Sequence, residues 1–359
     1  MSSGAVGAVV AYDAVVVGAG PNGLTAAARL ASAGWSTLVL EAASTVGGGA
    51  RTAALIRDDV RNDVCSAVHP LGIASLAFEA LGLEHHGLRW LQPPVAMAHP
   101  LPDGDAAVLH NSLDATVREL GRDGVQYRRL LGHFVSRWPA LRPSVLGPLI
   151  SWPEHPLLLS WFGLKSLPPV SWSVRRFSSP RAPALLGGMA AHSMLPLNRP
   201  LTTAAGLVLA VTGHSRGWPV AAGGSQSISN ALASVIHSHG GTVATDTVVR
   251  RLSDVPPARA VLLDVTPRQL ADLAGPDLPE ATARRVRRFR YGVGTCKVDY
   301  LLSGPIPWTS PVCAAAGTVH VGGTFPEIAA SEAAVHAGAH AERPFTLVGQ
   351  PTVADPSRA

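Results

Sequence analysis

The feature that most constrains this chain is a glycine turn that directly follows a short apolar run near the N-terminus. Residues 14–17 are Ala-Val-Val-Val, and residues 18–23 are Gly-Ala-Gly-Pro-Asn-Gly. A continuous apolar run predicts a strand buried on both faces of a parallel sheet. Residues 24–31 are rich in alanine and leucine, which favours a helix that packs closely on a sheet, and Gly34 is suited to end it. The turn is therefore expected to join a strand to a helix.

The spacing of the three glycines in this turn predicts a site for the ADP part of a dinucleotide. Gly18 permits the tight turn, Gly20 lets the backbone approach a diphosphate, and Gly23 allows the helix to touch the strand. The first helical residues, Pro21 and Asn22, stand where a helix N-terminus offers N–H groups and a positive dipole to phosphates.

An acidic residue closes the second apolar run of the chain. Glu41 follows residues 37–40 and lies 18 positions after Gly23. A carboxylate there can accept hydrogen bonds from the adenosine ribose, and it would repel a 2′-phosphate. We expect Glu41 and its neighbour Ala42 to lie at the adenosine end of the site.

A second glycine-rich segment, VGGGART at residues 46–52, distinguishes between cofactors that contain ADP. Gly48 and Gly49 would let the backbone pass close to a second face of the diphosphate, and Arg51 could pair with its charge. A plain NAD-dependent dehydrogenase has no need of such a segment. We therefore predict FAD as the cofactor, and an NAD-dependent dehydrogenase is the alternative. If the segment binds no cofactor, it is a flexible glycine loop.

The domain organisation is indicated by changes in sequence texture. Residues 76–214 are rich in proline and tryptophan, and a Gly-Gly pair at 223–224 and a helical pattern with Ser225 as its N-cap follow. The alternation of residues 242–249 then predicts a strand, and the apolar run at 261–263 predicts a second, buried one. We expect a Rossmann-like α/β domain with a three-layer parallel sheet, formed discontinuously by residues 11–75 and 215–275. An inserted α+β substrate or cap domain would comprise residues 76–214 and 276–359.

Composition and charge exclude several classes of protein. The chain of 359 residues is 47% hydrophobic and 15% charged, which indicates a globular fold. Its net charge of +5 is an arginine bias, since only two of its 29 basic residues are lysines, and we expect no nucleic-acid partner. The dense arginine cluster at residues 284–290 is expected to face solvent, with contact to anionic lipid as the alternative.

The chain has no pattern typical of a metal site or of a serine hydrolase. Cys65, Cys296 and Cys313 lie too far apart in sequence for a redox pair or a zinc site, and we expect all three to be buried. The histidines at 85–86 and at 237 and 239 lack metal-ligand spacing, and no G-x-S-x-G is present. No metal is predicted.

The hydropathy pattern gives a prediction of location. No apolar run reaches the length of a membrane span, and the N-terminus lacks a basic signal region, so we expect a cytoplasmic protein. The apolar stretch at residues 157–162 of the cap could wall an apolar substrate pocket or contact a membrane interface. Peripheral membrane contact therefore stays open, and the oligomeric state is not indicated.

The sequence resembles the phytoene-desaturase-like flavoproteins, which have the glutathione-reductase-type FAD fold. The likeness rests on VVVGAGPNGLTAAARLASAGWSTLVLE with VGGGART, and continues in SAVHPLG, AAHSMLPL, GWPVAAGGSQSISNAL, RYGVGTCKVDYLLSGPIPW and GTVHVGGTFPEI. Within this family the chain is most similar to the branch labelled pyridine nucleotide-disulfide oxidoreductase domain protein 2. It departs from the family at Ala43, where a basic residue is usual, and it resembles a C-terminally truncated member because a glycine-rich segment under the flavin is not found.

The resemblance implies an FAD-dependent oxidoreductase that oxidises an apolar or amine-like small molecule by hydride transfer to flavin. It also implies that Val248 contacts adenine through its backbone, and that Lys297, on a strand, reaches the flavin through a water. His69 could act on the flavin as an acid or base, and His192 could line the substrate cavity. A non-catalytic remnant of the fold or an interaction protein is the remaining alternative.

Overall fold

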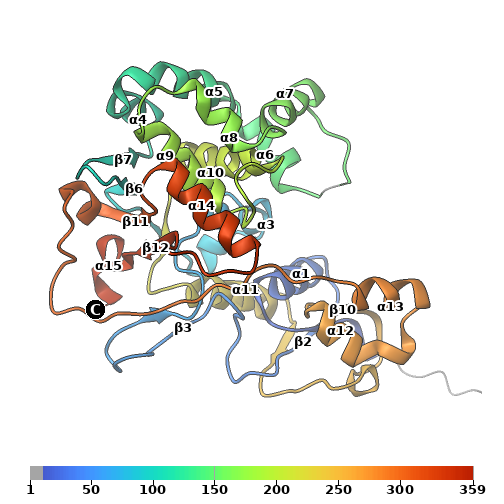
Figure 1. Ribbon diagram of the computed structural model, residues 1–359. Helices are drawn as coiled ribbons and strands as arrows, with labels where there is room; N and C mark the ends of the chain where they lie inside the picture. Colours follow the sequence, from blue (N-terminus) through green and yellow to red (C-terminus); the bar gives the residue numbers. More distant parts are fainter. Residues whose placement is uncertain (1–10, 149, 359) are drawn as a thin grey trace, which may run out of the picture. The chain divides into compact units, whose positions relative to one another are not determined.

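The computed structural model describes residues 11–148 and 150–358, which divide into two units (Figure 1). Unit 1 comprises the described residues up to Ser66, residues 77–89 and residues 222–291. Unit 2 comprises residues 67–76, residues 90–221 and the described residues from 292 onward. The expected boundaries differ from these: residues 77–89 and 276–291 lie in unit 1, whereas residues 67–75 and 215–221 lie in unit 2.

Unit 1 contains a four-stranded parallel sheet in the order β10-β1-β2-β9. Its strands are β1 (Tyr12–Val17), β2 (Thr37–Leu40), β9 (Thr242–Ala244) and β10 (Ala258–Leu263). The central strand β1 is buried at residues 14–17, as its apolar run predicts. The helices α1 (Pro21–Ser32) and α11 (Gln226–Ser238) pack on each other. The predicted Rossmann-like parallel sheet is therefore confirmed.

The remaining elements of unit 1 are short. They are β3 (Thr52–Ala53), β4 (Asn62–Asp63), α3 (Leu76–Ala80), α12 (Pro267–Ala274) and α13 (Glu280–Arg287), with 3-10 turns at Leu83–His86, Leu252–Asp254 and Gly275–Asp277. The turn at Leu83–His86 packs on α11, and α13 packs on α12, which explains why these segments belong to unit 1.

Two local expectations in unit 1 are wrong, and a third holds only in part. The strand expected at 242–249 ends at Ala244, because Asp246 has a positive φ and its N–H donates to the Ala43 carbonyl. The run at 261–263 is only partly buried, since β10 is an edge strand with Val261 exposed. Ser225 stands at the N-cap position of α11, as predicted, but its hydroxyl donates to the Ser66 carbonyl and makes no capping hydrogen bond.

Unit 2 contains a mixed four-stranded sheet in the order β12-β11-β6-β7. Its strands are β6 (Val95–Pro100), β7 (Ala106–Leu109), β11 (Ala316–Val321) and β12 (Thr346–Gly349); β11 and β6 are parallel and the other pairs are antiparallel. A separate antiparallel pair joins β5 (Trp90–Leu91) to β8 (Val220–Ala221).

The helices of unit 2 bury a large core against this sheet. Figure 1 shows α9 (Arg181–Ala191) beside α10 (Thr202–Arg216) and α14 (Phe325–His336), and α9 also packs on β6 and β7. The largest core side chains include Trp138, Tyr127 and Phe134. The other helices are α2 (Pro70–Ile73), α4 (Leu113–Glu119), α5 (Gly124–Ser136), α6 (Trp138–Leu146), α7 (Pro156–Ser166), α8 (Val170–Ser173) and α15 (Pro351–Ala354), with 3-10 turns at Gly121–Asp123, Val174–Arg176, Pro311–Ala315 and Pro356–Arg358.

Unit 2 is thus an α+β body that includes α2 and β8, which lie outside the segments expected to form the cap. None of the helices in the described residues combines the length and the hydropathy that crossing a membrane requires.

Candidate nucleotide-binding site

The glycine turn lies between the carboxyl end of β1 and the N-terminus of α1. Gly18 has a φ of +102°, and a Cβ on it would lie 2.5 Å from the Asp264 carbonyl oxygen. A Cβ on Gly23 would lie 2.2 Å from the Gly18 carbonyl oxygen. Both glycines are therefore required by the close approach of the polypeptide to itself.

Gly20 differs from the other two glycines of the turn. Its φ of −69° and ψ of 171° are open to any residue, and an added Cβ would meet only the Asp264 Oδ2, at 3.2 Å. A methyl group at this position would therefore be tight, and the Asp264 Oδ2 would have to shift by a few tenths of an ångström to admit it. The predicted role of Gly20, close approach of a ligand to its backbone, would add a second reason for glycine here.

Asp264 is a site residue that the sequence analysis missed. Its Oδ2 accepts a hydrogen bond of 2.7 Å from the Gly23 N–H, in the first turn of α1. The sequence pattern marks Asp264 only as the residue that follows the apolar run at 261–263. The available signal was its position directly after a parallel strand, because the carboxyl ends of such strands line the binding edge of the sheet.

Glu41 is fixed at the end of β2 by two backbone donors. Its Oε2 accepts from the Ala19 N–H at 2.7 Å, and its Oε1 accepts from the Ala43 N–H at 2.9 Å. Each carboxylate oxygen has a further lone pair, so hydroxyl groups of a ribose can still donate to it. The carboxylate is thus held in place beside the glycine turn.

The segment that follows β9 lies against the backbone of Glu41. The Thr247 N–H donates to the Glu41 carbonyl at 2.8 Å, and Val248 follows with an exposed side chain. Ala42 is exposed beside Glu41. The structure thus brings the expected adenosine-end residues into one neighbourhood.

The second glycine segment packs against the first. The Gly47 N–H donates to the Ala19 carbonyl at 2.7 Å, and a Cβ on Gly48 would lie 3.1 Å from the Gly20 Cα. The Arg51 Nε donates to the Gly48 carbonyl at 2.9 Å, which folds the arginine over its own loop. Two segments far apart in sequence therefore form one surface at the N-terminus of α1.

Helix α11 holds this second segment in place. The Gln226 Nε2 donates to the Val46 carbonyl at 3.0 Å, and the Ser229 hydroxyl donates to the Ala50 carbonyl at 3.1 Å. Gly49 packs beside Cys65. The loop is therefore anchored rather than a free glycine linker.

Lys297 is not on a strand, in contrast to the expectation. It lies in the segment 289–310, which has no helix or strand, and it forms an ion pair with Asp299. No strand of the described chain pairs with this segment, and Gly292, Gly294 and Pro305 interrupt it. Alternating side chains alone do not make a strand without a partner edge. Its catalytic role stays a prediction.

His69 lies at the start of α2 in unit 2. Its N–H donates to the Pro219 carbonyl at 2.8 Å, and its ring centroid lies 6.1 Å from that of Trp90. The first contact holds the backbone of His69, and the second places its ring beside that of Trp90. Its role toward a flavin also stays a prediction.

A cluster of three histidines in unit 2 was not predicted from the sequence, which considered only His192. The Nε2 atoms of His192 and His320 are 3.4 Å apart, and the His99 Nε2 donates to the Gly323 carbonyl at 2.7 Å. Burial lowers the pKa of His99 to about 4. Burial, followed by the neighbouring His192 and His99, holds the pKa of His320 well below its usual value. These imidazoles are neutral at physiological pH.

The structure also shows which of the cysteines and clustered arginines are exposed to solvent. Cys313 is buried, whereas Cys65 and Cys296 are exposed, so the expectation that all three are buried is wrong. The arginines of α13 are exposed, and Arg287 pairs with Glu280 at 3.0 Å. Within the described residues, no group of three or more His, Cys, Asp or Glu side chains is arranged to hold a metal ion.

Known proteins show similarity to parts of this chain. Residues 16–78 match a family model described as an NAD(P)-binding Rossmann-like domain. A limonene dehydrogenase polypeptide of Castellaniella defragrans is 36% identical over 114 residues, which are 31% of this chain and 20% of that protein.

Solved structures agree with this assignment of the fold. An oxidoreductase from Methanosarcina mazei has a TM-score of 0.52 at 18% identity, and a Pyrococcus furiosus protein has a TM-score of 0.51 at 16% identity. Each alignment covers 77% of this chain and 65% of the other. The chain thus spans about a fifth of the curated relative and about two thirds of these structures. It carries a Rossmann-like nucleotide-binding domain.

Proposed function

We propose that this chain is an FAD-dependent oxidoreductase of the phytoene-dehydrogenase-like type, which oxidises an apolar or amine-like substrate by hydride transfer to flavin. The observation that carries the proposal is the contact between the two glycine segments, with Gly48 against Gly20 at the N-terminus of α1. FAD supplies the hydride acceptor, and the protein supplies binding and orientation. The oxidoreductases among the similar proteins support the same chemistry.

The residues that we propose to hold FAD all lie in unit 1. Glu41, Ala42 and Val248 would bind the adenosine end. The α1 N-terminus would bind the diphosphate, and the second glycine segment would cover its inner side and the ribityl chain. At the α1 N-terminus the proposed residues are Gly18, Gly20, Pro21, Asn22 and Gly23. In the second glycine segment they are Gly48, Gly49 and Arg51.

The substrate class is supported by one relative. The name of the limonene dehydrogenase polypeptide refers to an apolar hydrocarbon, and the matched part of that protein covers 31% of this chain. Lys297 and His69 are the side chains we propose for proton handling at the flavin. Histidine and lysine are both among the side chains that act as general acids or bases in enzymes.

The test compares Gly20→Ala with wild type. The added methyl group requires the Asp264 Oδ2 to shift by only a few tenths of an ångström, whereas a diphosphate against the Gly20 backbone would collide with the methyl group. Near-UV circular dichroism verifies that the variant is folded. We expect purified wild type to carry the visible absorbance of flavin, or to take up FAD with a rise in Tm, and Gly20→Ala to do neither. Gly275→Ala is the matched control, because it lies in the same unit with nothing within 4 Å of the added Cβ.

The outcomes separate the alternatives. A wild-type protein that neither contains nor binds FAD would refute the proposal. If NAD raises the Tm and FAD does not, the protein is an NAD-dependent dehydrogenase. If neither nucleotide binds, the non-catalytic alternative holds.

A further inference from the structure

Helix α7 in unit 2 has apolar residues on both of its faces. Its inner face is buried, with the Phe162 ring edge-to-face on Phe134 at 5.1 Å between centroids. Its outer face carries Leu157, Trp161 and Leu164, which follow helical spacing and are all exposed. A surface helix normally presents polar residues to water, so this outer face indicates a contact with another apolar phase.

Further exposed apolar residues flank α7 in the sequence. Ile150 and Trp152 precede the helix, and the Trp152 side chain is 92% exposed. Leu167 follows the helix and is also exposed. We call the following six residues the α7 patch: Ile150, Trp152, Leu157, Trp161, Leu164 and Leu167. Large apolar side chains this exposed, on consecutive segments, mark an interaction surface.

Two positive charges and one negative charge lie in or beside the α7 patch. Residues 147–167 contain Glu154 and Lys165, and the Lys165 Nζ lies 4.6 Å from the centroid of the Trp161 ring. Arg137, which follows α5 and is exposed, adds the second positive charge at a pocket shared with Leu157 and Trp161. An apolar surface with positive charges complements the interface of a bilayer that contains anionic lipids.

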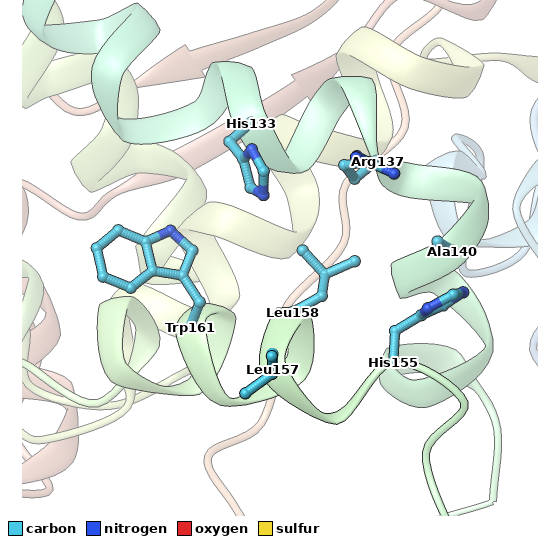
Figure 2. A pocket seen from close by; sticks show the side chains of 7 residues that line it. All are labelled: His133, Arg137, Ala140, His155, Leu157, Leu158 and Trp161. Atoms are coloured by element: carbon cyan, nitrogen blue, oxygen red, sulfur yellow. The ribbon is translucent and has the colours of Figure 1, made fainter.

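A pocket of about 250 Å³ joins the charged and apolar parts of this surface (Figure 2). Figure 2 shows Leu157, Leu158 and Trp161 on α7, with His133 and Arg137 on the opposite side. A guanidinium binds a phosphate group with charge-assisted hydrogen bonds. The apolar side chains would meet the glycerol and the first part of the acyl chains.

We propose that the α7 patch is a membrane-docking surface, which places Trp152 and the outer face of α7 in the interface of an anionic bilayer with a headgroup phosphate in the pocket. Tryptophan is enriched at such interfaces because its ring is apolar and its N–H is polar. A second copy of the chain is a poorer occupant, because a symmetric contact brings Arg137 and Lys165 toward their own counterparts. The proposal does not depend on the bound cofactor.

The test is sedimentation of the full chain with vesicles of phosphatidylcholine, with and without phosphatidylglycerol. We expect wild type to bind the anionic vesicles. The affinity of the double variant Trp152→Ser/Leu157→Ser for these vesicles should be at least about tenfold lower. Val125→Ser is the matched control, because Val125 is a 57% exposed apolar residue elsewhere in unit 2, and its binding should equal wild type. Near-UV circular dichroism verifies that each variant is folded.

A charge variant tests the role of the pocket. Arg137→Gln should lower the preference for anionic vesicles several-fold, while near-UV circular dichroism stays unchanged. The proposal is overturned if wild type binds neither vesicle, or if the double variant binds as wild type does. It is also overturned if light scattering shows a wild-type dimer that the double variant converts to monomers, without vesicle binding by either.

Discussion

The buried histidines of unit 2 make its stability depend on pH between neutral and mildly acidic conditions. Burial lowers the pKa of both His99 and His214 from 6.5 to about 4. The unfolded chain therefore binds more protons than the folded protein in this interval. Stability is complete above pH 6.5 and is lost as the pH falls below that value toward 4.

The magnitude follows from the size of the pKa shift. When the pH falls from about 7.5 to about 5, it ends about 1.5 units below the pKa of a histidine in the unfolded chain. Each buried histidine then lowers the free energy of unfolding by about 2 kcal/mol. His99 and His214 together should therefore lower the free energy of unfolding by about 4 kcal/mol. His320, whose pKa is also depressed by burial, should add to this loss.

The assay is urea denaturation at the two pH values, monitored by tryptophan fluorescence. Trp138 and Trp218 are buried in unit 2 and report its unfolding. His99→Gln keeps an N–H donor for the Gly323 carbonyl but does not titrate. We expect this variant to lose about 2 kcal/mol less than wild type between the two pH values.

The difference between wild type and His99→Gln in this pH-dependent loss of free energy cancels the contribution of every other titrating group. Glu332 is one such group, because burial raises its pKa and so acts in the opposite direction. If wild type and His99→Gln lose the same free energy of unfolding, the imidazole of His99 is not a buried neutral group, and the reasoning is refuted.

Two further predictions concern packing and buried polar contacts in unit 2, and urea denaturation at neutral pH measures both. Gly188→Ala should lower the free energy of unfolding by about 1–3 kcal/mol, because the new Cβ would lie 2.7 Å from the His320 Nδ1 and 3.1 Å from the His99 Nδ1; an unchanged value would contradict this packing. Asp123→Ala should lower it by about 2–3 kcal/mol, because Asp123 accepts hydrogen bonds from the N–H and the hydroxyl of both Ser178 and Ser179; a neutral effect would mean that water replaces the carboxylate.

The parts of the fold that could be predicted are those encoded by neighbouring residues. The strand before Gly18, the helix after it, and the end of that helix near Gly34 each depend on a short stretch of sequence. The strand expected around Lys297 was wrong because a strand also needs a partner edge, which no local pattern supplies. The three-residue length of β9 likewise depends on a distant contact, from Asp246 to Ala43.

The same limit applies to surfaces and sites. The apolar run at residues 157–162 does not show which side chains are buried, and only the packing of Phe162 on Phe134 leaves Leu157 outside. The histidine cluster combines residues from β6, β11 and the end of α9, so that no spacing in the sequence indicates it. The glycine turn was predictable as a motif, but its contact with Asp264 joins positions 241 residues apart.

The contact between Asp264 and the turn leads to a prediction about the affinity of the site. The Asp264 Oδ2 occupies the Gly23 N–H, and it lies 3.2 Å from where a Cβ on Gly20 would be. A diphosphate held against Gly20 would therefore have a negative charge close to it. At about 5 Å in a hydrated site, the repulsion is about 1 kcal/mol.

Asp264→Asn removes this charge and keeps an oxygen that can accept from the Gly23 N–H. We expect the variant to bind FAD roughly fivefold more tightly than wild type at low ionic strength, which corresponds to about 1 kcal/mol. The difference should shrink as salt is added, because salt screens a charge effect but not a change in shape. Isothermal titration of FAD into the apoprotein at two salt concentrations measures this, with Asp264→Ala as the comparison that removes the acceptor as well. Weaker binding by Asp264→Asn than by wild type would show that the carboxylate supports the turn more than it repels the ligand.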